Sequence, residues 1–279
     1  MTTDTPSKDW SHGTGIFIAI AFFFGGLAGG TYLISLYFNN LLGMFIAWIF
    51  AICMGLADSA HLGNKFIAWR IAFRPGSSWI SRGLIFVVLF LGAAAIQMAI
   101  TQWAPGTVPE TLFKVIAGIG AFGVAVYSGF VISYVSSIKF WSSGIMPVLF
   151  IIAGLTGGAA VLMAVNAFTA DIAFNTLKNV AAIALVVYAI IIAGHLWIAT
   201  YSSSTAKHSV KTIVAGDLAY LFWFVVVLIG IVAPIVLTLT VKEGSQALFI
   251  LNAVCVLAGG MSLRYIILSA GKYSSLLPQ

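Results

Sequence analysis

The chain has 279 residues, of which 61% are hydrophobic and only 7% are charged, and its mean hydropathy is +1.10. Soluble domains carry roughly a quarter of charged residues, so this composition excludes one and indicates a membrane protein. The net charge of +6 follows from membrane topology and indicates no nucleic-acid partner.

Eight apolar runs are each long enough to cross a bilayer as a helix, which takes roughly 20 residues. The sequence therefore predicts an all-α polytopic protein, surrounded by membrane lipid, with no separate soluble domain. The polar segment before Gly13 is short and precedes a long apolar run, so no cleavable signal peptide is expected. We place the spans near residues 14–38, 41–60, 83–103, 112–136, 145–168, 178–200, 217–240 and 246–268.

Lysine and arginine are distributed unevenly between the two sides of these spans. With the N-terminus inside, the outer side holds only Lys114, Lys178 and Lys242. Positive residues resist translocation, so this split predicts that both termini are cytoplasmic. The ten basic residues on the inner side are Lys8, Lys65, Arg70, Arg74, Arg82, Lys139, Lys207, Lys211, Arg264 and Lys272.

A glycine-rich motif of the first span, residues 25–30, recurs in the fifth span at residues 154–158. The second and sixth spans both end on a His-Leu pair, at His61 and His195. This recurrence predicts two four-helix bundles related as a parallel repeat, residues 1–140 and 141–279. Chance recurrence is the alternative, because glycine is common in membrane helices.

Two cysteines, Cys53 and Cys255, lie singly in the second and eighth spans. Neither has a partner at metal-ligand or redox spacing, so we expect both to be packing residues. The protein is therefore expected to hold no iron–sulfur cluster and to provide no other metal site.

Ionisable side chains at membrane depth are costly and mark functional sites. In this sequence they gather at the cytoplasmic ends of the spans, whereas the outer halves offer only amides such as Gln97, Asn166 and Asn252. The function is therefore expected at the inner rim. The residues that map there include His12, Asp58, His61, Arg82, Tyr127, His195, His208, Asp217 and Arg264.

Asp58 and His61 are three residues apart at the end of the second span, so they share a helix face. A carboxylate beside an imidazole forms a proton-acceptor region, which oxidation of a hydroquinone requires because two protons leave with two electrons. The alternative is a pair that only closes the helix end. Tyr127 either donates a hydrogen bond to a quinone carbonyl or packs at the interface.

The connection over residues 61–82 is the longest and most basic. Its first part is amphipathic and is expected to lie along the membrane surface, although a purely topogenic role is the alternative. Ser77 or Ser78 is a candidate cap for the third span.

Several ordered motifs make the protein resemble the NrfD/PsrC/DmsC group, the quinone-interacting integral membrane subunits of molybdopterin oxidoreductase complexes. Together these motifs cover nearly the whole sequence. They are His61-Leu62-Gly63, Arg74-Pro75, Ser78-Trp79-Ile80-Ser81-Arg82-Gly83, Tyr127-Ser128-Gly129, Gly154-Leu155-Thr156-Gly157-Gly158, Phe222-Trp223 with Gly230 and Pro234, and Gly259-Gly260 with Leu263-Arg264-Tyr265 and Gly271.

The resemblance implies eight helices in two bundles, no haem, and an exchangeable menaquinone or ubiquinone near the rim. A ferredoxin-like four-cluster iron–sulfur subunit would carry electrons between this quinone and a molybdopterin catalytic subunit holding molybdenum or tungsten. The protein itself would not act on that subunit's terminal substrate. Such a complex belongs to a prokaryotic cytoplasmic membrane.

Carried over by position, Tyr127 matches the family's quinone-site tyrosine, and His61 stands where members have His, Asp or Glu. Polysulfide reductase-like members have polar residues early in the first helix, where this sequence has Ile18 and Ala21. We therefore expect other contacts to complete the quinone pocket, with His12 and Arg82 as candidates.

Sidedness also departs from the polysulfide reductase pattern, in which the partner lies outside. Here the basic loops and the predicted pocket share the cytoplasmic side, as in a dimethyl sulfoxide reductase-type anchor. Quinone type and the direction of electron flow stay open.

Two other functions are compatible with the composition. A haem b anchor would need facing histidines, which His61 and His195 could supply. A small-solute transporter would use the parallel repeat, but it normally has polar residues near the midplane.

Overall fold

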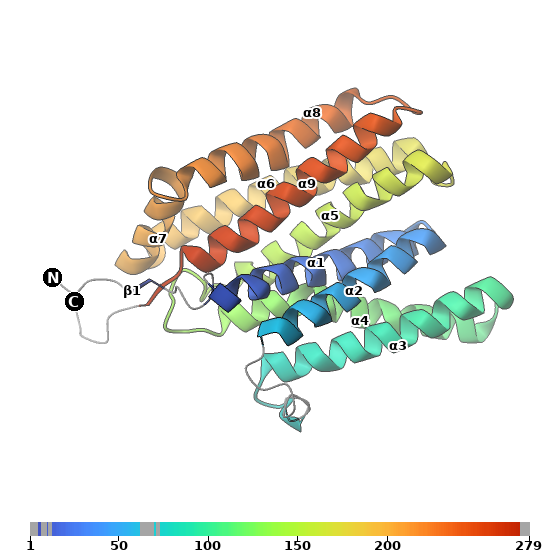
Figure 1. Ribbon diagram of the computed structural model, residues 1–279, viewed down its shortest axis with the longest axis horizontal. Helices are drawn as coiled ribbons and strands as arrows, with labels where there is room; N and C mark the ends of the chain where they lie inside the picture. Colours follow the sequence, from blue (N-terminus) through green and yellow to red (C-terminus); the bar gives the residue numbers. More distant parts are fainter. Residues whose placement is uncertain (1–4, 7–9, 11–12, 62–69, 71–72, 274–279) are drawn as a thin grey trace.

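The computed structural model describes residues 5–6, 10, 13–61, 70 and 73–273, and this part of the protein is almost entirely helical. Eight of its helical segments are long and apolar enough to cross a membrane, which confirms the predicted fold class. They lie roughly side by side (Figure 1). The segments are α1 (Ile16–Tyr37), α2 (Leu41–His61), α3 (Trp79–Trp103), α4 (Val108–Ser133), α5 (Ile145–Thr169), α6 (Phe174–Ser202), η4 (Leu221–Val232) continued by α8 (Ala233–Thr240), and α9 (Gln246–Ser269).

Some boundaries differ from the predicted ones because polar caps decide where a helix begins. Helix α3 begins at Trp79, before the apolar run, since the Ser78 hydroxyl accepts a hydrogen bond from the Ser81 amide at 3.3 Å. The predicted cap at Ser78 is thus confirmed. A short helix that the apolar pattern did not predict, α7 (Ser204–Ala215), follows α6 and is capped by Ser203.

The seventh span is unusual because η4 has π-helical hydrogen bonding before it continues as α8. Pro234 has no amide hydrogen to donate, which locally alters the hydrogen-bond ladder. Gly230 also contacts α9 closely, since a Cβ there would lie 2.6 Å from the Gly259 Cα. Small residues at both positions allow this close approach.

Helices α1 and α5 cross at the centre of the molecule, and their two glycine motifs face each other. A Cβ on Gly30 would overlap the Gly154 carbonyl, and one on Gly158 would lie 2.5 Å from the Thr31 amide nitrogen. Around this crossing, α1 also packs on α2 and α4, and α5 also packs on α6 and α9. These contacts fit two four-helix bundles, and the division at residue 140 remains a prediction.

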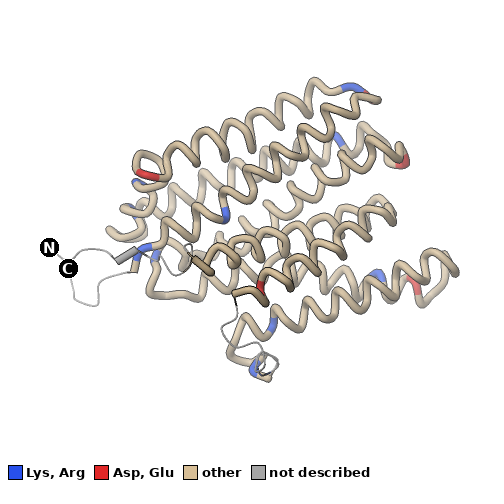
Figure 2. Tube along the Cα trace, viewed as in Figure 1, with Lys and Arg blue, Asp and Glu red and all other residues tan. Residues whose placement is uncertain are grey.

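The two ends of the described part of the protein meet at one end of the helices. Strand β1 (Thr5–Pro6) pairs antiparallel with β2 (Lys272–Tyr273), and the Trp10 indole donates to the Tyr273 hydroxyl at 3.3 Å. Charged residues lie mainly near the two ends of the helices (Figure 2). This distribution is the one expected of a multi-pass membrane protein.

Candidate functional site

Asp58 and His61 lie together in the last turn of α2, as predicted from their spacing. Asp58 is half-buried and interacts electrostatically with the exposed imidazole of His61. The His61 Nδ1 atom lies 3.1 Å from the Thr14 carbonyl oxygen, to which an Nδ1–H donates. This contact ties the end of α2 to η2 (Gly13–Gly15), the turn that precedes α1.

Tyr127 on α4 completes this group from the opposite side of the first bundle. Its side chain is 5% exposed, and its hydroxyl lies near the Asp58 carboxylate and interacts with it electrostatically. Phe22 of α1 packs edge-on against the tyrosine ring, with 6.5 Å between ring centroids. Two of the predicted residues, far apart in sequence, therefore touch in the structure.

Gly83 on α3 leaves the space that the Tyr127 ring occupies. A Cβ at this position would overlap the Cδ2 atom of the ring. The sequence indicates this glycine only as part of a motif, without a role. The structure shows that it sets where the tyrosine ring can lie.

Arg82 lies at the rim, and its contacts are to the loop before α3. Its Nε donates to the Pro75 carbonyl at 2.7 Å, and its Nη2 donates to the Gly76 carbonyl at 2.9 Å. The guanidinium also lies 4.4 Å from the centroid of the Trp79 ring, which stacks on Phe130 at 4.1 Å. Arg82 thus holds the turn beside the group, whereas His12 lies outside the described residues.

A phenol, a carboxylate and an imidazole in this arrangement can hydrogen-bond a polar headgroup and accept protons from it. Within the described residues, no three His, Cys, Asp or Glu side chains come together as metal ligands. Cys53 and Cys255 are both free thiols. The side chains of Asp58, His61 and Tyr127 themselves can supply proton transfer and hydrogen bonding at the rim.

The two histidines that a haem would need do not face each other. His61 is exposed beside Thr14, whereas His195 is 2% exposed and packs against Phe140, with 4.9 Å between ring centroids. The residues around His195 come from the second half of the sequence, among them Ile213 and Phe222.

A series of linked polar side chains occupies the other end of the first bundle, where the sequence suggested only amides. The fully buried Tyr32 hydroxyl donates to Gln97 at 2.9 Å, Gln97 to Thr101 at 2.7 Å, and Thr101 to Glu110 at 2.7 Å. Glu110 also forms a salt bridge with Lys114 at 2.9 Å. The expectation was wrong because Tyr32 and Glu110 bring a phenol and a carboxylate to this end.

A wide apolar groove between α2 and α3 lies at that same end. It is lined by Leu41, Leu42, Phe45, Trp48, Ala95 and Met98. None of these side chains is ionisable.

Comparison with known proteins gives the context of this geometry. A family model described as polysulphide reductase, NrfD, matches residues 10–274. The C chain of polysulfide reductase from Wolinella succinogenes is 29% identical over 168 residues, which are 57% of the present sequence and 53% of that protein. Protein NrfD of Escherichia coli is 27% identical over 246 residues, 76% of each of the two proteins. The match thus spans about half the length of the Wolinella protein.

Proposed function

Because the protein belongs to the polysulphide reductase NrfD family, we propose that it exchanges electrons with membrane quinone at the Asp58–His61–Tyr127 group. Family membership makes it a membrane subunit of an oxidoreductase complex. The observation that carries the finer proposal is the proximity of the Tyr127 hydroxyl on α4 to the Asp58 carboxylate on α2, with His61 alongside. This arrangement places proton-accepting groups close together at one end of the helices.

The residues fit a quinone headgroup. A quinol supplies two electrons and two protons when it is oxidised, and its polar oxygens need hydrogen-bond partners in an otherwise apolar setting. Tyr127 is positioned to donate to one such oxygen, and Asp58 with His61 to accept the protons. Leu56 and Ile80 beside the group are exposed, at 66% and 54%, as is suitable for entry from the lipid.

The direction of proton release follows from this placement. Asp58 is half-buried and His61 is exposed at the end of α2, so a proton accepted there is next to water. In the topology proposed from the charge distribution, this water is cytoplasmic and both termini lie on the same side. The membrane would be the prokaryotic cytoplasmic membrane, and menaquinone and ubiquinone both meet the same hydrogen-bonding requirement.

The electrons must leave through another polypeptide. We propose that a ferredoxin-like four-cluster iron–sulfur subunit docks at this rim and connects it to a molybdopterin catalytic subunit. The Wolinella relative is named as one lettered polypeptide of polysulfide reductase, so that protein is one subunit among several. Reduction of quinone by the same route in reverse is equally allowed by these residues.

The test is steady-state turnover of the whole complex in membranes, driven either by quinol or by a reducing dye that bypasses this subunit. Asp58→Asn and Tyr127→Phe should each lower quinol-driven turnover at least tenfold and leave dye-driven turnover unchanged, since proton transfer contributes about 10²–10⁴-fold. Tyr201→Phe, an exposed tyrosine, is the control. Quinol-driven turnover within about twofold of wild type in both variants would place the site elsewhere (under ~0.5 kcal/mol in the barrier).

A further inference from the structure

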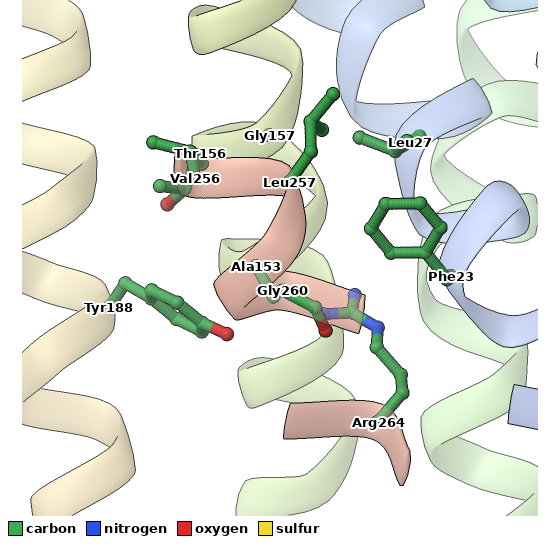
Figure 3. A pocket seen from close by; sticks show the side chains of 10 residues that line it. All are labelled: Phe23, Leu27, Ala153, Thr156, Gly157, Tyr188, Val256, Leu257, Gly260 and Arg264. Carbon is green, nitrogen blue, oxygen red and sulfur yellow. The ribbon is translucent and has the colours of Figure 1, made fainter. Parts of the chain in front are cut away.

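Arg264 on α9 is buried between the two halves of the molecule, with 3% of the residue exposed. Its guanidinium reaches between α1 and α5, while Tyr188 of α6 points toward it from the other side (Figure 3). Gly26 provides part of the space, since a Cβ there would lie 2.8 Å from the Arg264 Nη2 atom. The sequence places this residue at the cytoplasmic end of the last span.

The positive charge of this guanidinium has no carboxylate partner among the described residues. Arginine stays protonated in proteins, and an uncompensated charge at this depth is costly. The nearest partners are weak: the Gly260 carbonyl lies 3.4 Å from Nη1, and the Phe150 ring centroid lies 5.1 Å from Cζ. Within the same described residues, the Nε atom has no hydrogen-bond partner.

The acidic residues that the structure describes are either paired or exposed. Asp58 interacts with His61 and Tyr127, and Glu110 is paired with Lys114. Asp171, Asp217 and Glu243 are exposed. Arg264 therefore needs its counter-charge from outside the described part of the protein.

A small cavity adjoins the guanidinium and carries a second unsatisfied donor. Its volume is about 10 Å³, room for little more than one water-sized particle, and Phe23, Thr156, Tyr188 and Gly260 are among its lining residues. The Tyr188 side chain is 2% exposed, and its hydroxyl lies near Arg264 without a hydrogen bond of regular geometry. The Thr156 hydroxyl instead donates to the Ile152 and Ala184 carbonyls, at 2.8 and 3.2 Å.

We propose that this cavity binds a small monovalent anion of the halide class, held by the Arg264 guanidinium and the Tyr188 hydroxyl. Two unpartnered donors that face one cavity, one of them charged, form the complement of such an ion. The cavity has room for about one small particle, so the occupant is a single ion without accompanying waters, and a lipid headgroup does not fit. The anion neutralises the buried charge at the junction of α1, α5, α6 and α9, independently of any quinone chemistry.

The first test measures the melting temperature of the purified full-length protein in detergent, in chloride and in gluconate at equal ionic strength. Chloride should raise the melting temperature saturably, because a ligand that binds only the folded state stabilises it. The effect should persist in Lys242→Gln, an exposed control, and vanish in Arg264→Gln. Equal melting temperatures in both salts, or a chloride effect that survives in Arg264→Gln, would overturn the proposal.

A second variant and a direct measurement decide the matter if Arg264→Gln does not fold. Tyr188→Phe removes one donor to the ion and should raise the chloride concentration for half-maximal effect about tenfold. Crystals grown in bromide should show an anomalous peak between the Arg264 guanidinium and Tyr188. An unchanged half-maximal concentration, or density at that position without anomalous signal, would show that only water fills the cavity.

Discussion

Gly83 on α3 lies directly against the ring of Tyr127 on α4, at a distance that leaves no room for any side chain. The glycine thereby determines the path of the tyrosine ring toward Asp58. This relationship makes Gly83 a positioning residue for the proposed quinone site, although it has no side chain to contribute.

Gly83→Ala is expected to displace the Tyr127 ring and to lower quinol-driven turnover of the complex at least tenfold, since a small misplacement can weaken catalysis by about 10². Dye-driven turnover and the amount of assembled complex should stay near wild type. Gly92→Ala on the same helix is the matched control, because a Cβ there meets nothing within 4 Å. Equal quinol-driven turnover in the two variants would contradict the positioning role of Gly83.

His61 is expected to act through its capacity to take a proton. His61→Leu should lower quinol-driven turnover at least tenfold, whereas His61→Glu should retain most of it because a carboxylate also accepts protons. Initial rates of quinol oxidation by membranes that contain equal amounts of complex provide the comparison. Similar losses in both variants would instead indicate that His61 serves only to fix the end of α2 against Thr14.

The close packing of α1 against α5 at their glycines is expected to be important for the stability of the protein. Gly154→Ala places a methyl group 2.5 Å from the Gly26 carbonyl oxygen, so the two helices must separate. Such overpacking costs about 1–3 kcal/mol, and the melting temperature of the purified protein should fall by several degrees. Gly194→Ala on α6, where a Cβ meets nothing within 4 Å, should change it little. An equal decrease in melting temperature in both variants would show that the contact between α1 and α5 is not the cause.

Quinol oxidation by the complex is expected to be electroneutral if the catalytic partner also consumes protons on the cytoplasmic side. Among the residues that the structure describes, no hydrogen bond joins the linked polar side chains at the other end of the first bundle to the proposed site. Tyr32 lies ten residues from Phe22 on α1, about 15 Å along the helix, and Phe90 packs on Tyr32 with 4.9 Å between ring centroids. Turnover in sealed, oriented vesicles should generate no membrane potential, and a sustained uncoupler-sensitive potential would disprove this proton path.

The sequence was sufficient for the features that depend on local patterns. Apolar runs predicted the eight spans, which the structure confirms, and the spacing of Asp58 and His61 predicted that they share a face. Helix α7 was missed because its apolar stripe is too short for a span.

Contacts between helices could not be predicted in the same way. The proximity of Tyr127 to Asp58 depends on how α2 and α4 both pack on α1, and the fit of Gly83 against Tyr127 depends on how α3 packs on α4. The burial of Arg264 could not be predicted from its place in the apolar run, because it depends on how α1, α5 and α6 pack around α9. The roles of His12 and Arg82 in the pocket remain predictions.

Covalent labelling of the intact complex can show whether quinone binds beside Asp58, His61 and Tyr127. A photoreactive quinone should label peptides from the last turns of α2, the first turns of α3 and the region of Tyr127 on α4. Excess unlabelled quinol should suppress this labelling, and Asp58→Asn should weaken it. Labelling confined to α5–α9, or labelling of the predicted peptides that excess quinol does not reduce, would contradict the account.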